Sequence, residues 1–201
     1  KKAYCTARVI TFKGRTQVIV PSAMATIAYE PNSGKELWRV IHGGMNACIP
    51  PLFGNGKVYI TTSSPSLLLA VRPDGSGDVT KSHVEWTTRQ GVPSRPAQLL
   101  DGESMFMVDN AGIASCIDLA TGKPRWTKRL AGKFTASPVL VDGRIYCFQR
   151  ESGTSHVIAA DPKAFRMLAT NTLDTGCMAS PALTNGLLIV RTKTHVYGIG
   201  K

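Results

Sequence analysis

Histidine and cysteine are the residues of this chain whose side chains most readily bind metals or act as acid, base or nucleophile. The four histidines (His42, His83, His156 and His195) follow no common spacing. The five cysteines (Cys5, Cys48, Cys116, Cys147 and Cys177) form no CxxC, CxxCH or mixed Cys/His motif, and their odd number leaves at least one thiol unpaired. These patterns favour hydrogen-bonded histidines and buried thiols over zinc, covalent haem or thioredoxin-like chemistry.

Serine and the acidic residues offer no clearer catalytic pattern. Ser137 and Ser180 each precede a proline, with no histidine or aspartate nearby in the sequence, so we expect serines that bond to the main chain rather than nucleophiles. Most of the 13 acidic residues fall in turn-like segments, for example Asp101, Asp142 and Asp161. What these side chains can do therefore depends on the strands and turns that position them.

Those elements repeat along the chain. A proline, four residues, a glycine and then an apolar run recur at residues 51–56, 138–143 and 181–186, with one inserted residue at 96–102 and in degenerate form at 9–14. Successive prolines are 45, 42 and 43 residues apart. A repeat of this length is typical of propellers and solenoids, in which each unit must bury its faces against its neighbours.

Each repeat divides into four short strands. The first ends in Asp-Gly or Asn-Gly, a strong signal for a type I′ hairpin. The second is a continuous apolar run, as expected for a strand covered on both faces, and the fourth carries a tryptophan at Trp38, Trp86 or Trp126. We expect each indole to pack between adjacent sheets while its N–H finds a carbonyl. No stretch has the period of an amphipathic helix.

The sequence therefore predicts an all-β fold of β-propeller blades, each with four antiparallel strands. We expect about four and three-quarter blades, because the last repeat stops after its third strand. The expected blades are 5–49, 50–94, 95–136, 137–179 and the incomplete 180–201.

The turn before the fourth strand resembles a known family. Asp118, Thr121, Gly122 and Trp126 match the blade motif of the pyrroloquinoline-quinone-type propeller repeats, and Gly34 to Trp38 repeats its Gly-Lys-x-x-Trp part. The repeats containing Trp86 and residues 161–168 depart from it. The resemblance implies a ring of seven or eight blades, so we expect further blades outside this chain, or a second copy of it that completes the ring.

One set of residues is a candidate binding site. The residue before the repeat proline is Arg8, Pro50, Arg95, Ser137 or Ser180, and the first strand of a propeller blade lines the central channel. Arg8, Arg95, Ser137 and Ser180 would then form a polar, cationic ring suited to an acidic side chain, a phosphate or a sugar acid. The alternative, that these groups only contact channel water, is favoured.

Charge and composition restrict the partners. The net charge of +11 is not concentrated, because apart from the Lys1-Lys2 pair the Lys and Arg residues are scattered singly or near one another. This pattern favours a solvated basic surface over a nucleic-acid or other polyanion site. No apolar run approaches the length of a membrane span, and no secretory signal is visible. The resemblance nevertheless implies a periplasmic, envelope-associated or secreted protein.

We therefore expect a non-catalytic scaffold that binds a protein or an extended peptide, without a cofactor. Two alternatives remain open. One is a quinoprotein-type dehydrogenase or sugar-handling enzyme that uses pyrroloquinoline quinone and calcium, with its active residues in absent blades. This chain lacks the adjacent cysteine pair of the alcohol dehydrogenases it resembles. The other is a module that binds polyanions through the positive charge.

Overall fold

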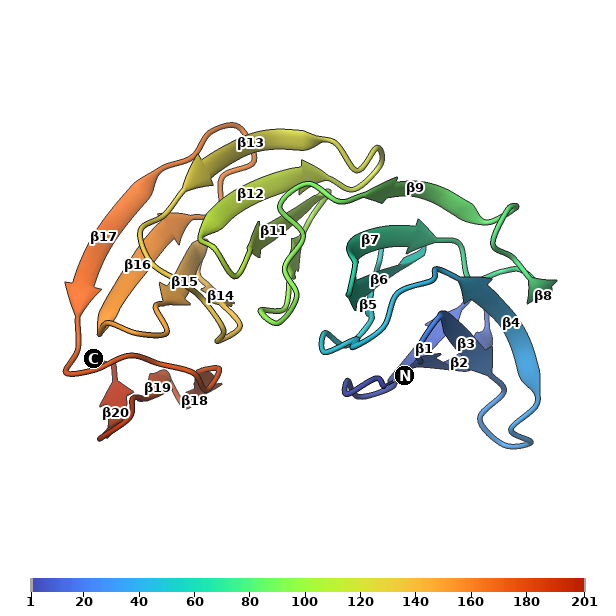
Figure 1. The fold of residues 1–201 in the computed structure, drawn as a ribbon, viewed down its shortest axis with the longest axis horizontal. Helices are drawn as coiled ribbons and strands as arrows, with labels where there is room; N and C mark the ends of the chain where they lie inside the picture. Colours follow the sequence, from blue (N-terminus) through green and yellow to red (C-terminus); the bar gives the residue numbers. More distant parts are fainter. Residues whose placement is uncertain (1, 201) are drawn as a thin grey trace. The chain divides into compact units, whose positions relative to one another are not determined.

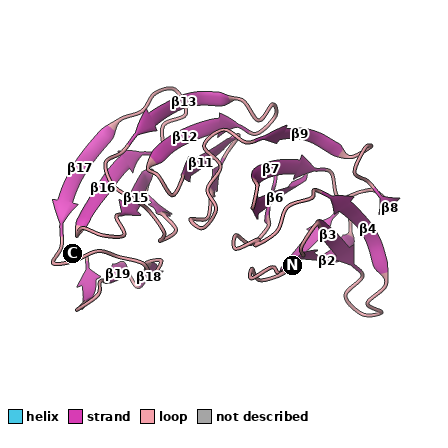
Figure 2. Ribbon diagram, viewed as in Figure 1, coloured by secondary structure: helices cyan, strands magenta, loops and turns pink. Residues whose placement is uncertain are grey.

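The structure, a computed structural model, describes residues 2–200 and consists of strands and loops (Figure 2). Lys1, from the basic pair at the start, and Lys201, from the last expected blade, lie outside the described residues. Within residues 2–200, twenty strands form five sheets, whose order along the chain is visible in Figure 1. The predicted all-β fold is confirmed. Residues 2–200 contain no helix that could span a lipid bilayer.

The chain divides into two compact units, and the first contains two sheets together with residues 119–122. The first sheet consists of β1 (Arg8–Phe12), β2 (Arg15–Pro21), β3 (Ala25–Tyr29) and β4 (Glu36–Ile41). The second consists of β5 (Leu52–Gly54), β6 (Lys57–Ser63), β7 (Ser66–Val71) and β9 (Val84–Thr88). Within each sheet these strands pair antiparallel in chain order.

The Gly/Ser-rich insertion before Trp86 adds a strand that the sequence analysis missed. Its short strand β8 (Gly77–Asp78) pairs parallel with β4, with Trp38 opposite Gly77 and Arg39 opposite Asp78. The first sheet therefore has five strands, and its outer edge is covered by a segment from the following repeat.

The second unit contains three sheets. The third sheet consists of β10 (Leu99–Asp101), β11 (Ser104–Val108), β12 (Ile113–Asp118) and β13 (Pro124–Arg129). The fourth consists of β14 (Val139–Val141), β15 (Arg144–Phe148), β16 (Thr154–Ala159) and β17 (Met167–Thr172). The fifth has three strands, β18 (Ala182–Thr184), β19 (Leu187–Arg191) and β20 (Val196–Ile199).

The hairpins between the first two strands of each sheet follow the turn chemistry of the sequence. Both central residues have positive φ at Asn55-Gly56, Asp142-Gly143 and Asn185-Gly186, as the predicted type I′ turns require. The third sheet differs, because Asp101 pairs with Ser104 and leaves Gly102-Glu103 as the turn. Only Gly102 has positive φ there, which is typical of a type II′ turn.

The core lies between the faces of neighbouring sheets and is apolar. In the first unit one buried cluster joins the first two sheets and includes Ile19, Trp38, Ile60 and Val71. In the second unit a cluster around Phe106, Cys116 and Phe134 joins the third and fourth sheets. A smaller cluster around Phe148, Cys177 and Val190 joins the fourth and fifth.

Tryptophans of the fourth strands connect successive repeats in the first unit. The indole N–H of the fully buried Trp38 donates to the Gln17 side chain at 2.7 Å, and Gln17 donates to the Pro73 carbonyl at 2.9 Å. The N–H of Trp86 donates directly to the Leu119 carbonyl at 3.0 Å. The Trp86 ring lies over Gly122, where a Cβ atom would come within 2.5 Å of the ring.

The same arrangement recurs in the second unit. The N–H of Trp126 donates to the Asp161 carbonyl at 2.8 Å. Its ring lies 6.0 Å from the Phe106 ring and 5.5 Å, edge to face, from the Phe165 ring. A large apolar ring with one satisfied donor thus fills the space between the third and fourth sheets.

Replacing Gly122 tests the stacking of Trp86, with Gly34 as a matched control. Both glycines have a left-handed φ, +70° and +68°, but nothing lies within 4 Å of a Cβ at Gly34. We expect Gly34→Ala to cost about 1 kcal/mol from backbone strain alone. Gly122→Ala should cost about 1–3 kcal/mol more because the indole must move. Urea unfolding of both variants measures the difference, and equal costs would refute the stacking.

Candidate functional site

The two serines of the predicted ring hold neighbouring sheets of the second unit together. The N–H of Ala97 donates to Ser137 Oγ at 3.0 Å, and the N–H of Ser137 donates to Ser180 Oγ at 2.9 Å. Each serine therefore accepts a bond from the same position of the preceding sheet. The prediction of serines that bond to the main chain is confirmed, and we call these two bonds the serine ladder.

Strand registers show which residues are equivalent to the serine ladder. Counted from the hairpin turns, Ser137 corresponds to Ser180, Ala97, Pro50 and Arg8. Arg95 lies two residues before Ala97, the residue equivalent to Ser137. The repeat prolines do not align the third sheet with the others, because its hairpin turn lies further from the proline. Arg95 is exposed, and so is Arg8, which belongs to the first unit. Ligand binding by Arg8, Arg95, Ser137 and Ser180 stays a prediction.

The serine ladder should contribute to the stability of the second unit. We expect Ser137→Ala to destabilise it by about 1–2 kcal/mol, because the Ala97 N–H loses a partly buried acceptor. Ser180→Ala should cost less, since its bond is exposed to water. Ser137→Thr retains an Oγ and should restore most of the loss. Thermal unfolding of the three variants gives the order, and an Ala variant as stable as the parent would contradict it.

A polar cluster that the sequence analysis did not find joins the fourth and fifth sheets. The Asp174 carboxylate accepts bonds from Thr192 Oγ1 at 3.3 Å and from Thr194 Oγ1, and lies 2.9 Å from His195 Nδ1. Partial burial acts to raise the pKa of Asp174, but hydrogen bonds from His195, Thr192 and Tyr197 outweigh it and hold the pKa well below its usual range. Asp174 is 21 residues from His195, so only the fold brings them together.

The geometry of this cluster is not that of a catalytic triad. Asp174 and Thr194 both contact Nδ1 of His195. A triad needs the carboxylate and the nucleophile on opposite ring nitrogens, so that one orients the base while the other loses its proton. The cluster therefore fastens the loop before β20 to the loop after β17.

The buried His156 and the half-buried His42 are also held by hydrogen bonds. His156 lies among Gln149, Thr170 and the Ala131 carbonyl. His42 Nδ1 accepts a bond from the Gly44 N–H at 3.2 Å, and its Nε2 lies 3.3 Å from Thr26 Oγ1. Across residues 2–200, no group of three or more His, Cys, Asp and Glu side chains is placed to hold a metal ion.

His42 should make the first unit sensitive to acid. Burial lowers its pKa below the ordinary value of 6.5, so the unfolded chain binds a proton more readily than the folded one. Stability is then fully present above about pH 6.5 and declines as the pH falls toward the folded pKa. Measured from pH 8 to pH 5, unfolding of the parent should show this decline. His42→Gln should flatten it, and an unchanged slope would exclude His42 as its source.

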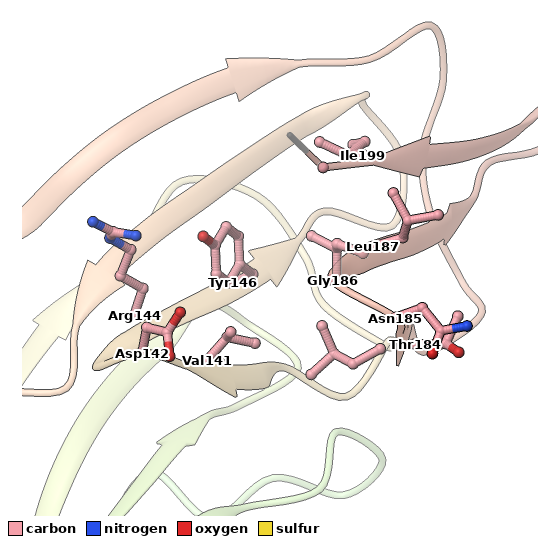
Figure 3. Close-up of a pocket in the computed structure, with 12 residues that line it drawn as sticks. Val141, Asp142, Arg144, Tyr146, Thr184, Asn185, Gly186, Leu187 and Ile199 are labelled. Carbon is pink, nitrogen blue, oxygen red and sulfur yellow. The ribbon is translucent and has the colours of Figure 1, made fainter.

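A cavity of about 580 Å³ opens between the fourth and fifth sheets. Figure 3 shows Arg144 and Tyr146 on the fourth sheet and Leu187 and Ile199 on the fifth. Leu187 is 37% exposed and Ile199 44% exposed. The cavity is therefore an open, largely apolar site with the charged residues Arg144 and Asp142 among its lining.

The fourth sheet lacks the tryptophan that the first three sheets carry on their fourth strands, as the strand registers show. In the first three sheets the fourth-strand tryptophan is paired directly before a register shift, opposite Ala28, Ala70 or Cys116. In the fourth sheet the same position, opposite Val157, holds Ala169. No indole therefore reaches from β17 toward the fifth sheet, whereas Trp126 fills the corresponding space between the third and fourth sheets.

Comparisons with known proteins agree with the fold. The model of a family described as outer membrane protein assembly factor BamB matches residues 23–198. Among solved structures, the crystal structure of BamB from Moraxella catarrhalis is similar, with a TM-score of 0.70 and 17% sequence identity. That similarity covers 100% of this chain and 60% of that one, so this chain spans less than two thirds of the length of that protein. No curated protein sequence matches this chain.

Proposed function

Because the chain belongs to the family of outer membrane protein assembly factor BamB, we propose that it is a propeller segment that binds partner proteins during outer-membrane assembly. The family match over residues 23–198 is the observation that carries this proposal. The antiparallel sheets and the structural similarity support the propeller fold. An envelope-associated, periplasmic location follows from the same proposal.

The cavity between the fourth and fifth sheets is the surface we assign to the partner. Exposed apolar side chains of Leu183, Leu187 and Ile199 line it, and apolar patches of this kind commonly mark interaction sites. An aromatic or branched apolar side chain of the partner fits best, because the equivalent space between the third and fourth sheets holds the indole of Trp126. The net charge of +11 favours an acidic partner surface around that anchor.

Function with pyrroloquinoline quinone and calcium is an alternative that the sequence left open. Calcium takes about six to eight oxygen ligands, and among residues 2–200 no cluster of carboxylates able to hold a metal ion is present. Function without a cofactor stays a prediction. Titration of the protein with the quinone in the presence of calcium tests it, and saturable calcium-dependent binding would contradict it.

A capture experiment tests the binding role. The immobilised protein should retain a partner from a bacterial envelope extract, and Leu187→Asp should weaken retention about tenfold by placing a charge in an apolar anchor site. Met167→Asp is the matched control, because Met167 is 40% exposed but does not line the cavity. It should bind like the parent.

Two results would overturn the proposal. One is an envelope extract from which nothing is retained specifically. The other is retention that heparin or high salt abolishes completely and that Leu187→Asp leaves unchanged, which would indicate polyanion binding instead.

A further inference from the structure

Two of the five cysteines lie on segments that run side by side in the first unit. The N–H of Asn46 donates to the Lys2 carbonyl at 2.7 Å, and the N–H of Tyr4 donates to the Ala47 carbonyl at 2.7 Å. Both segments therefore run in the same direction, and Cys5 and Cys48 each come directly after the residues of the Tyr4–Ala47 bond. Neighbouring strands are about 4.8 Å apart, and a disulfide joins Cα atoms about 4.4–6.8 Å apart.

The surroundings of the two thiols agree with this register. Burial raises the pKa of the Cys5 thiol, and the neighbouring Cys48 adds to that increase, so the two sulfurs are within electrostatic range of each other. Cys48 Sγ contacts the Asn46 carbonyl at 3.2 Å. Both cysteines are only half-buried, so a dissolved oxidant can reach them.

The remaining cysteines are placed differently. Cys116, Cys147 and Cys177 are buried in the second unit, with at most 2% of each residue exposed. Burial raises the pKa of Cys147 to about 12, which keeps it a thiol rather than a reactive thiolate. Only Cys5 and Cys48 therefore combine proximity with access.

At the positions of the serine ladder, the first two sheets carry residues other than serine. In the second unit, Ser137 and Ser180 connect the first strands of neighbouring sheets. The equivalent residues of the first two sheets are Arg8 and Pro50, and proline has neither a hydroxyl nor an N–H to offer. Cys5 and Cys48 lie just before these two positions, where a covalent link would serve in place of the ladder.

We propose that Cys5 and Cys48 form a disulfide that joins the segment leading into β1 to the segment leading into β5. The oxidant is a second disulfide, either a small molecule such as oxidised glutathione or a protein. One cysteine thiolate attacks it, forms a mixed disulfide and releases one thiol. The other cysteine then attacks the mixed disulfide and releases the second thiol, so the protein loses two hydrogens and two electrons to the oxidant.

The bond would close a loop between residues 43 apart in the sequence and restrict the unfolded chain accordingly. This inference does not depend on the binding role proposed above. It concerns the stability of the first unit, whatever partner the protein binds.

Peptide mapping after equilibration with reduced and oxidised glutathione tests the proposal. We expect a cross-linked peptide pair that contains Cys5 and Cys48, while Cys116, Cys147 and Cys177 remain available to alkylation after unfolding. A folded protein in which Cys5 and Cys48 are both alkylated under these conditions would overturn the proposal. A cross-link that instead joins either cysteine to another chain would also overturn it.

Stability provides a second measurement. Reduction should lower the melting temperature of the oxidised parent by about 5 °C or more. Cys5→Ser and Cys48→Ser should each melt at one temperature with and without reductant, whereas the control Cys177→Ser should keep the dependence. An oxidised parent that melts at the same temperature as its reduced form would contradict the proposed link.

Discussion

The contact between a tryptophan ring and the turn of the following repeat is the interaction on which the packing of these sheets depends. A sheet of four short strands has two apolar faces and cannot bury either alone, so its stability comes from its neighbours. The indole is large enough to fill the wedge between two twisted sheets, and its one polar group donates to a main-chain carbonyl in the cases of Trp86 and Trp126. The Trp38 indole is connected to a main-chain carbonyl, that of Pro73, through the Gln17 side chain.

Several smaller features serve this contact. Gly122 has no side chain because the Trp86 ring occupies the place where a Cβ would lie. The register shift after Ala28, Ala70 and Cys116 lies directly beside the tryptophan of the fourth strand, and a bulge at such a place can re-aim a side chain. Where Ala169 replaces tryptophan, the sheets are joined at one end by Asp174 and its hydrogen bonds, and a cavity opens at the other.

The sequence predicted the fold well because a propeller repeats its local signals. The turns at Asn55 and Asp142 and the apolar second strands each depend on neighbouring residues, and the period showed how they combine. The Asp174 cluster and the closeness of Cys5 to Cys48 depend on residues brought together by tertiary structure, with no local signal of their own. Arg95 was aligned with Ser137 because the prolines match, whereas the Gly102-Glu103 turn shifts the strand by two residues.

Strand β8 has a consequence for how this protein meets other chains. An outermost strand carries unpaired N–H and carbonyl groups that invite another polypeptide to extend the sheet, and proteins commonly block such strands. In the first sheet, Gly77 and Asp78 pair with part of β4 and occupy those groups with the protein's own backbone. On β13, the charged side chains of Lys128 and Arg129 disfavour pairing with a strand of another chain. The insertion thus works as a guard against aggregation on an outer strand that is rich in apolar residues, with Leu37, Val40 and Ile41.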